Sequence, residues 1–252
     1  MIRHMSVLKY LMYLIGVTFI VRVNGQNPVF ITEGKIEYER RDNLHAQFKD
    51  YESEMWAELD KKTTPQFKTS YFDLFFSPGK TLYKPGRENP ENNKIWEQPA
   101  EDNVIYNDIE AETTVSQKRI FEQTFLIQDS TRKIKWKITD ETRTIAGFQC
   151  RRANAIIMDS IYVVAFYTDE IVTPSGPESF SGLPGMILGV ALPHQHITWF
   201  ATKVQVIATK PADLAAPKKG EKTTYVALKK TLNDRMKEWG RYGRWYLQSV
   251  IL

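Results

Sequence analysis

The sequence predicts a mainly β fold, a curved antiparallel sheet arranged as a sandwich or half-barrel, with one short helix early in the chain and a helix at the C-terminal end. Three observations support this class. Short strand patterns follow one another closely between residues 104 and 208, strands do not alternate with helices as in α/β folds, and residues 133–138 alternate strictly between lysine and apolar side chains. Such alternation is typical of an antiparallel strand with one wet and one buried face.

The first third of the chain predicts a strand, a helix and a hairpin. Ile36 and Tyr38 alternate with charged residues, which predicts a first strand over 31–40. Apolar residues recur every three or four positions in 43–61, which predicts an amphipathic helix that covers one side of the sheet and ends at residues 63–65. A proline-glycine turn then joins two predicted hairpin strands, residues 70–76 and 81–84.

The rest of the chain predicts further strands and a closing helix. Residues 87–93 are polar and predict a surface loop, and the three residues from Met158 to Ser160 are short enough to join their neighbours as a hairpin. Leu228, Leu232, Met236 and Trp239 share one face of the predicted helix, which follows a linker at 211–222 and is interrupted at Gly240 and Gly243. The predicted strands are residues 104–109, 113–127, 133–138, 142–157, 161–167 and 197–208.

Residues 175–192 form the stretch around which the chain is organised. Gly182 and Gly185 can adopt positive φ at low cost, while Pro177 and Pro184 fix φ and lack an N–H group. These four residues predict a rigid, irregular loop seated against the core, because a flexible linker would not be pinned in this way. The apolar run that follows the loop predicts a buried strand.

This loop and the segments before it resemble the signature of the GLPGLI family, exported proteins of Bacteroidetes-type bacteria. Met186 stands where the family has its second leucine, and the resemblance is strongest from about residue 133 to residue 188. It implies a shared fold and export, and it supplies no catalytic residues. The matching segments, in the family's order, are Lys133-Ile134-Lys135-Trp136, Ile145-Ala146-Gly147-Phe148-Gln149-Cys150, Arg152-Ala153, Ala165-Phe166-Tyr167-Thr168, Glu170-Ile171, Gly176-Pro177 and Gly182-Leu183-Pro184-Gly185.

The N-terminus predicts a signal peptide over residues 1–25, cleaved near Gly25. The apolar stretch 10–21 is shorter than the about 20 residues of a membrane span and is closed by Arg22, although a membrane anchor is the alternative. Cleavage removes three basic residues and no acid, so the net charge falls from +4 to +1. A surplus this small gives no reason to expect nucleic-acid binding, which usually shows a basic patch.

Cys150 is the only cysteine, so no disulfide can form within the chain. Because no cysteine lies near the predicted cleavage site, the sequence argues against a bacterial lipoprotein. Phe148 and Ala153, the neighbours of Cys150, predict a strand in a packed sheet. We therefore expect a buried thiol that packs as a small apolar residue rather than a reactive one.

The glycine-rich turn is the first candidate for a functional site. Gly182, Leu183, Pro184 and Gly185 are the predicted ligand-binding residues, because successive backbone N–H groups in a tight turn can cradle an anion. The same residues also fit a purely structural turn beside the core.

Two histidines are the second candidate. His194 and His196 are two positions apart, so on a strand their imidazoles would share one face and could bind one metal ion. Two ligands are too few for a closed metal site, and a solvated turn after Pro193 is the alternative.

Ser179 and Ser181 are possible nucleophiles. A nucleophile elbow needs a glycine two positions before and two positions after its serine, on a strand-to-helix turn. Neither serine has this spacing, and no helix follows. A secreted hydrolase is therefore an alternative function rather than the leading one.

Several aromatic residues exceed what one helix face needs, and some of them are expected to form a surface for a partner or ligand. They are Trp56, Trp96, Trp239, Trp245 and Tyr246.

Together these patterns predict an exported, non-enzymatic protein, an accessory or ligand-binding component in the periplasm or at the outer membrane. Its parts are the signal peptide 1–25, a β domain 26–210, and a linker with a helical tail 211–252. An outer-membrane transport or envelope protein is the expected partner, with no nucleic acid and no stable membrane span after processing. The sequence assigns no cofactor. The alternatives are a secreted hydrolase acting on a peptide or polymer and a metal-binding protein that uses His194 and His196.

Overall fold

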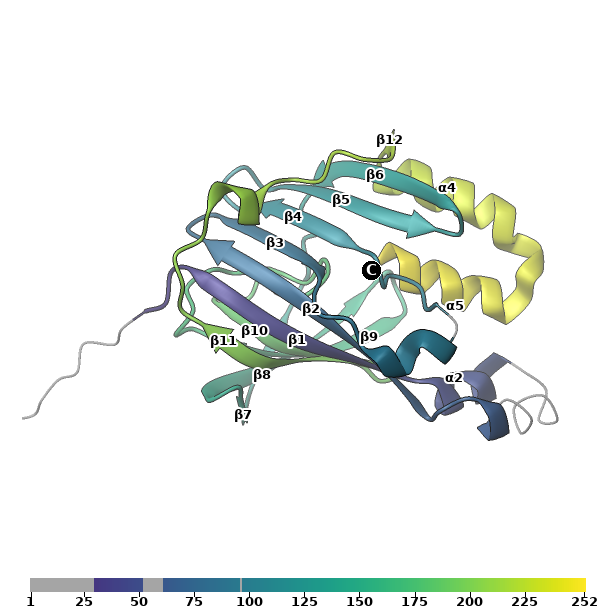
Figure 1. Ribbon diagram of the computed structural model, residues 1–252, viewed down its shortest axis with the longest axis horizontal. Coiled ribbons are helices and arrows are strands. Elements are labelled where there is room, and N and C mark those ends of the chain that lie inside the picture. The colour runs from purple at the N-terminus through teal and green to yellow at the C-terminus, as the bar shows by residue number, and fades with distance from the viewer. Residues whose placement is uncertain (1–29, 52–60, 96) are drawn as a thin grey trace, which may run out of the picture.

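The computed structural model describes residues 30–51, 61–95 and 97–252, and its main feature is one open, curved sheet of twelve strands (Figure 1). The predicted fold class is therefore confirmed, and because the strands form one continuous sheet, the half-barrel arrangement describes it better than the sandwich does. The predicted signal peptide, residues 1–25, and Trp56 and Trp96 lie outside the described residues.

The sheet is ordered β12-β6-β5-β4-β3-β2-β1-β11-β10-β9-β8-β7, so that β1 near its middle pairs with β2 on one side and β11 on the other. All neighbours are antiparallel except β12, which pairs with β6 in parallel. The strands are β1 Gly34–Asn43, β2 Phe67–Ser77, β3 Lys80–Pro85, β4 Val104–Asp108, β5 Thr113–Ile120, β6 Gln123–Ser130, β7 Lys137–Ile145, β8 Phe148–Ile157, β9 Ile161–Thr168, β10 Met186–Leu192, β11 Ile197–Gln205 and β12 Glu221–Thr223.

Two predicted hairpins are confirmed. The proline-glycine turn joins β2 to β3, with Gly79 at φ +75°. Met158 and Asp159 also have positive φ, in the turn that joins β8 to β9. Tight turns of this kind match the right-handed twist of the strands that they connect.

Three predicted strands differ from the structure by more than their end residues. The predicted strand over 113–127 is two strands, because residues 121 and 122 turn the chain between β5 and β6. Residues 133–136 alternate between exposed and half-buried side chains but form no ladder, and β7 begins only at Lys137. The reason is that this segment packs against the loop before β10, where Trp136 Nε1 donates a hydrogen bond of 2.9 Å to the carbonyl of Ser181. The predicted strand over 142–157 is two strands, because Ala146 and Gly147, both at positive φ, turn the chain between β7 and β8.

Helices lie at the two ends of the chain. α2, Leu44–Tyr51, is the described part of the helix predicted over 43–61. At the C-terminus the predicted interruption at Gly240, at φ +59°, is confirmed, because α4 (Tyr225–Met236) ends before it and α5 (Gly240–Ile251) begins there. The predicted interruption at Gly243 is wrong, since this glycine lies inside α5. A Cβ at Gly243 would lie 2.6 Å from the carbonyl of Met236, so only glycine allows this close approach. The remaining elements are η1 Pro90–Lys94, η2 Pro211–Leu214, α4 Tyr225–Met236, η3 Lys237–Trp239 and α5 Gly240–Ile251.

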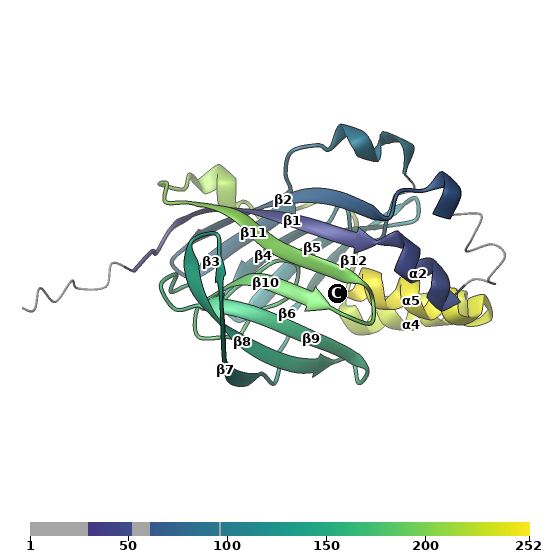
Figure 2. The same ribbon diagram turned by 90° about the horizontal axis from the view of Figure 1, so that it is seen from below.

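The helices α4 and α5 pack beside β6 and its neighbours, and the C-terminus lies on the inner side of the curve (Figures 1 and 2). No helix of the described residues is long and apolar enough to cross a membrane. Three residues of the predicted apolar face, Leu228, Leu232 and Met236, form a small core with β5 and β6, whereas Trp239 lies in η3 and is 45% exposed.

The interior of the curved sheet has an apolar side and a polar side. The strands from β8 to β11 contribute most of the main apolar core, including Trp199, which is fully buried. The strands β1, β3, β4 and β5 instead direct several polar side chains inward. These are Arg40, Asp42, Thr81, Asn107, Thr114, Ser116 and Lys118.

Candidate functional site

Residues 175–185, here called the interior loop, connect β9 to β10 and join the two sides of the curved sheet. On the polar side, Ser175 Oγ lies 3.1 Å from Thr81 Oγ1 of β3. On the apolar side, Phe180 packs edge-on against Trp199 of β11, with ring centroids 6.2 Å apart. The stretch that the sequence predicted as a rigid loop is therefore part of the core.

The two glycines of the interior loop have positive φ, +89° at Gly182 and +139° at Gly185. A Cβ at Gly185 would lie only 2.1 Å from the carbonyl oxygen of Thr168. At Gly182 the nearest atom, Nε1 of Trp136, is 3.9 Å away. Gly185 is thus required by both φ and close approach, and Gly182 by φ alone.

The backbone N–H groups of these glycines are used within the protein. The N–H of Gly182 donates to Pro174 at 3.4 Å, and that of Gly185 donates to Leu183 at 2.8 Å. Leu183 is buried in the main core, Pro184 is exposed, and Gly182 lines a cavity beside the loop. A ligand beside this turn would therefore be held mainly by neighbouring side chains.

Glu178 is a fully buried carboxylate in the interior loop, and it has a positive φ of +52°. Asn103 Nδ2 donates a hydrogen bond of 2.8 Å to its Oε2. Burial raises the pKa of Glu178 by more than the charges of Lys118 and Arg40 and the bond from Asn103 lower it. Sequence reasoning missed this residue, although it is the single charge in an otherwise uncharged loop.

A buried ion pair on β1 belongs to the same polar interior. Arg40 Nη2 donates to Asp42 Oδ1 at 2.8 Å, and Nη1 donates to the carbonyl of Pro99 at 2.9 Å. The guanidinium carbon also lies 5.3 Å from the ring of Trp199. Because desolvation offsets much of the attraction in such a pair, its main effect is to fix these groups in place.

The end of α5 enters the interior and is held there by side chains from three different parts of the chain. Lys118 and Arg132 are cations at the C-terminal end of a helix, where they complement the helix dipole. Ser179, the candidate nucleophile, uses its hydroxyl in the same way. The bonds run from Lys118 Nζ to the carbonyl of Val250 at 3.0 Å, from Arg132 Nη2 to that of Ile251 at 2.7 Å, and from Ser179 Oγ to that of Leu252.

A cavity of about 320 Å³ lies beside the interior loop, and we call it the Arg132 cavity. Among the described residues no carboxylate lies within ion-pair distance of Arg132, whose buried Nη1 has no hydrogen-bond partner. Burial also lowers the pKa of Arg132. Lys133 adds a second cation and pairs with Glu112 at 2.9 Å. The lining is completed by Asn107, Ile109, Thr131, Ile134, Pro174, Ser175, Ser181 and Gly182.

The two histidines lie in the turn between β10 and β11 rather than on a strand. His194 is exposed, and His196 is half-buried at φ +57°. The backbone carbonyl of His196 accepts a hydrogen bond of 2.9 Å from the N–H of Asn43. The part of the chain that the structure describes contains no group of three or more His, Cys, Asp or Glu side chains placed to hold a metal ion.

Comparison with known proteins gives one family match and a distant structural likeness. Residues 156–189, which include β9 and the interior loop, match a family described as "Protein of unknown function (Porph_ging)". A search of curated proteins finds no match.

Two structures of PNGF-II, in space groups C2 and P21, resemble this chain with TM-scores of 0.52 and 0.51, each at 15% sequence identity. The likeness covers 79% of this chain and 32% or 33% of PNGF-II, so this chain spans about a third of that protein's length. At this level of identity the comparison shows a related fold and nothing about activity.

Proposed function

We propose that the protein is an exported member of the GLPGLI family that acts as a non-enzymatic binding component in the periplasm or at the outer membrane. The signal-peptide pattern over residues 1–25 and the family resemblance support export. The match of residues 156–189 to a family of unknown function is compatible with this membership and assigns no reaction.

The Arg132 cavity is the observation on which the binding role rests. Burying a cation without an opposing charge is unfavourable, and an anion that enters the cavity would supply that charge. Arg132 and Lys133 exceed the single lining carboxylate, Glu112, by one positive charge. The proposed ligand is therefore a small anion that carries a phosphate or carboxylate group.

The size and polarity of the cavity agree with such a ligand. Its volume of about 320 Å³ falls at the lower end of the roughly 300–1,000 Å³ typical of small-molecule sites. The lining also includes Ser181 and Asn107, whose hydroxyl and amide are polar groups that can orient a ligand. A bidentate contact from a guanidinium would favour planar or tetrahedral oxyanions over halides.

Calorimetric titration with inorganic phosphate and with citrate tests this site. We expect binding by the parent protein and clear weakening in Lys133→Gln, an exposed position whose change should leave the fold intact. Arg132→Gln should abolish binding, with its melting temperature measured alongside because Arg132 also holds Ile251. Arg235→Gln, an exposed change on α4, is the matched control. Equal binding by the parent protein and Lys133→Gln, or no binding by the parent protein, would contradict the proposed site.

Export is tested separately. The native protein should be recovered from the periplasmic or outer-membrane fraction, and mass spectrometry should place its N-terminus near residue 26. Recovery of the protein from the cytoplasmic fraction with residues 1–25 still attached would contradict export. That result would have no bearing on the Arg132 cavity.

A further inference from the structure

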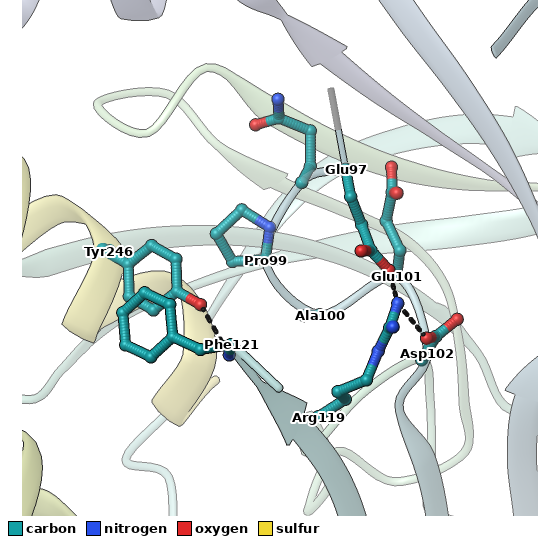
Figure 3. Close-up of a pocket in the computed structure, with 9 residues that line it drawn as sticks. Glu97, Pro99, Ala100, Glu101, Asp102, Arg119, Phe121 and Tyr246 are labelled. Atoms are coloured by element: carbon teal, nitrogen blue, oxygen red, sulfur yellow. Dashed lines mark hydrogen bonds and ion pairs between the residues drawn. The ribbon is translucent and has the colours of Figure 1, made fainter. Parts of the chain in front are cut away.

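A second cavity, of about 230 Å³, lies between the β5–β6 turn, the segment before β4 and α5 (Figure 3). We call it the Arg119 pocket. It does not share a lining residue with the Arg132 cavity, so a ligand bound here would be independent of the proposed function. The pocket is lined by Glu97, Gln98, Pro99, Ala100, Glu101, Asp102, Arg119, Phe121 and Tyr246.

One side of the Arg119 pocket is aromatic. Phe121 stacks on Tyr246, with ring centroids 4.8 Å apart and planes 3° from parallel, and Trp239 meets Phe121 edge-on at 5.6 Å. Phe121 nevertheless stays 49% exposed and Trp239 45% exposed. Two of the aromatic residues that the sequence singled out, Trp239 and Tyr246, are thus gathered around an exposed ring at the mouth of a cavity.

Phe121 also occupies an unusual backbone position. It is the first of two residues in the turn between β5 and β6, and its φ is +55°. Two-residue hairpins favour glycine, asparagine or aspartate at a position of positive φ. A phenylalanine here is strained and leaves a large apolar ring at the surface, and strain of this kind concentrates at functional sites.

The other side of the pocket is charged and has an excess of acid. Arg119 Nη2 pairs with Asp102 at 2.7 Å and with Glu97, as the dashed lines in Figure 3 mark. Glu101 pairs at 2.7 Å with Lys68, a buried residue of β2. Three carboxylates therefore face two cations, and one negative charge is left over.

We propose that the Arg119 pocket receives the side chain of a lysine or arginine from a partner polypeptide. The apolar stem of that side chain would lie against Phe121, and its cation would join the carboxylates of Glu97 and Asp102. A cation beside aromatic faces is attracted by their electron-rich surfaces, and the surplus carboxylate supplies the opposing charge.

The volume of the pocket favours one side chain over a complete small molecule. About 230 Å³ is below the roughly 300–1,000 Å³ of typical small-molecule sites. The electrostatics agree, because burial and the neighbouring charge of Glu101 raise the pKa of Asp102, as expected where negative charges crowd together. A bound cation would relieve this repulsion.

The test is an NMR titration of the isotopically labelled protein with N-acetyl-lysine amide, N-acetyl-arginine amide and N-acetyl-norleucine amide. Norleucine keeps the apolar stem and lacks the charge. We expect the two cationic probes to shift the amide signals of Asp102 and Phe121 and the indole signal of Trp239, and the norleucine probe to bind at least about fivefold more weakly. Added salt should weaken the cationic probes selectively.

Two variants make the outcome specific. Asp102→Asn should lower affinity for the lysine probe about fivefold. Phe121→Asn should lower it about two- to fivefold, because it removes the ring against which the apolar stem lies, a loss of roughly one buried CH₂ of apolar contact. Asparagine tolerates the positive φ, so the hairpin should fold. Glu110→Gln, an exposed acid outside the pocket, is the control and should bind as the parent protein does. Norleucine binding as tightly as lysine, signal shifts elsewhere on the protein, or unchanged binding by both pocket variants would overturn the proposal.

Discussion

Asn103 and Glu178 form a hydrogen bond of 2.8 Å that connects the residue before β4 to the interior loop, and the two residues are 1% and 0% exposed. The bond places a carboxylate inside the curved sheet among the cations Arg40 and Lys118. Because neither partner reaches solvent, the ionisation of Glu178 is coupled directly to folding.

The first prediction concerns the dependence of stability on pH. The glutamate in the unfolded chain titrates near 4.5, and the pKa of Glu178 in the folded protein is higher. The folded state therefore binds the proton more tightly, so the contribution of this group to stability falls as the pH rises from about 4.5 through the folded pKa.

Glu178→Gln removes that contribution, so its free energy of unfolding should decline less over the same pH window than that of the parent protein. Urea unfolding at a series of pH values measures this difference. Glu110→Gln, an exposed change, is the matched control and should follow the parent curve. Parallel curves for Glu178→Gln and the parent protein would show that Glu178 ionises as freely in the folded state as in the unfolded chain.

The second prediction separates the two glycines of the interior loop. Gly182→Ala should cost about 1 to 3 kcal/mol, the usual strain of positive φ in a residue with a Cβ. Gly185→Ala should cost more, because its Cβ would also lie 2.1 Å from the carbonyl of Thr168 and the backbone must move. Gly147→Ala, at φ +90° with no atom within 4 Å of the added Cβ, is the matched control for strain alone. The melting temperature should be highest for Gly147→Ala, close to that for Gly182→Ala, and clearly lowest for Gly185→Ala. A Gly185→Ala protein that melts at the same temperature as the other two would contradict the argument from close approach.

Most of the sheet could be predicted from the sequence because hydrophobic periodicity and turn residues are local signals. The hairpin at Pro78 and Gly79 and the buried strand after Gly185 are examples. Residues 133–136 show where the signal fails, since half-burial against the interior loop produces the same alternation as half-burial in a sheet. Periodicity reports which face is buried and does not report the hydrogen-bonding partner.

The candidate sites could be predicted only in part, for a different reason. Its glycines and prolines predict the interior loop, but the charged residues that meet there come from distant strands. Lys118 and Arg132 approach α5 across more than a hundred residues of sequence. In a sequence such charges resemble ordinary surface residues, and Lys118 is 1% exposed only because the sheet curves around it. The spacing of His194 and His196 suits two metal ligands on one face of a strand, whereas the chain turns at this point.

The third prediction concerns Cys150. It is buried on β8, and burial raises the pKa of its thiol to about 12. Since the thiolate is the reactive form, the native protein at neutral pH should react with a disulfide reagent far more slowly than the unfolded chain. Absorbance after mixing, with and without denaturant, measures the two rates. Rapid labelling without denaturant would mean that β8 opens locally or that the thiol is accessible.

The last prediction concerns the attachment of α5. Lys118 Nζ donates to the carbonyl of Val250 and lies 5.9 Å from the ring centre of Tyr225, and its charge also opposes that of Glu178. Lys118→Met keeps most of the side-chain length and removes the donor and the cation. A hydrogen bond from a charged group is worth about 1.5 to 3 kcal/mol, and the loss of compensation for Glu178 adds to this cost.

The effect should be greatest in α5, because the contacts of Lys118 join that helix to the interior. Hydrogen exchange followed by mass spectrometry should show that Lys118→Met speeds exchange more in peptides from Gly240–Ile251 than in peptides from β1 or β11. Lys229→Met, an exposed change on α4, should leave both unchanged. If Lys118→Met speeds exchange equally throughout the sheet, the lysine stabilises the whole fold rather than the attachment of α5. If the substitution changes nothing, Arg132 and Ser179 are sufficient to hold the end of α5, since their bonds to Ile251 and Leu252 do not depend on Lys118.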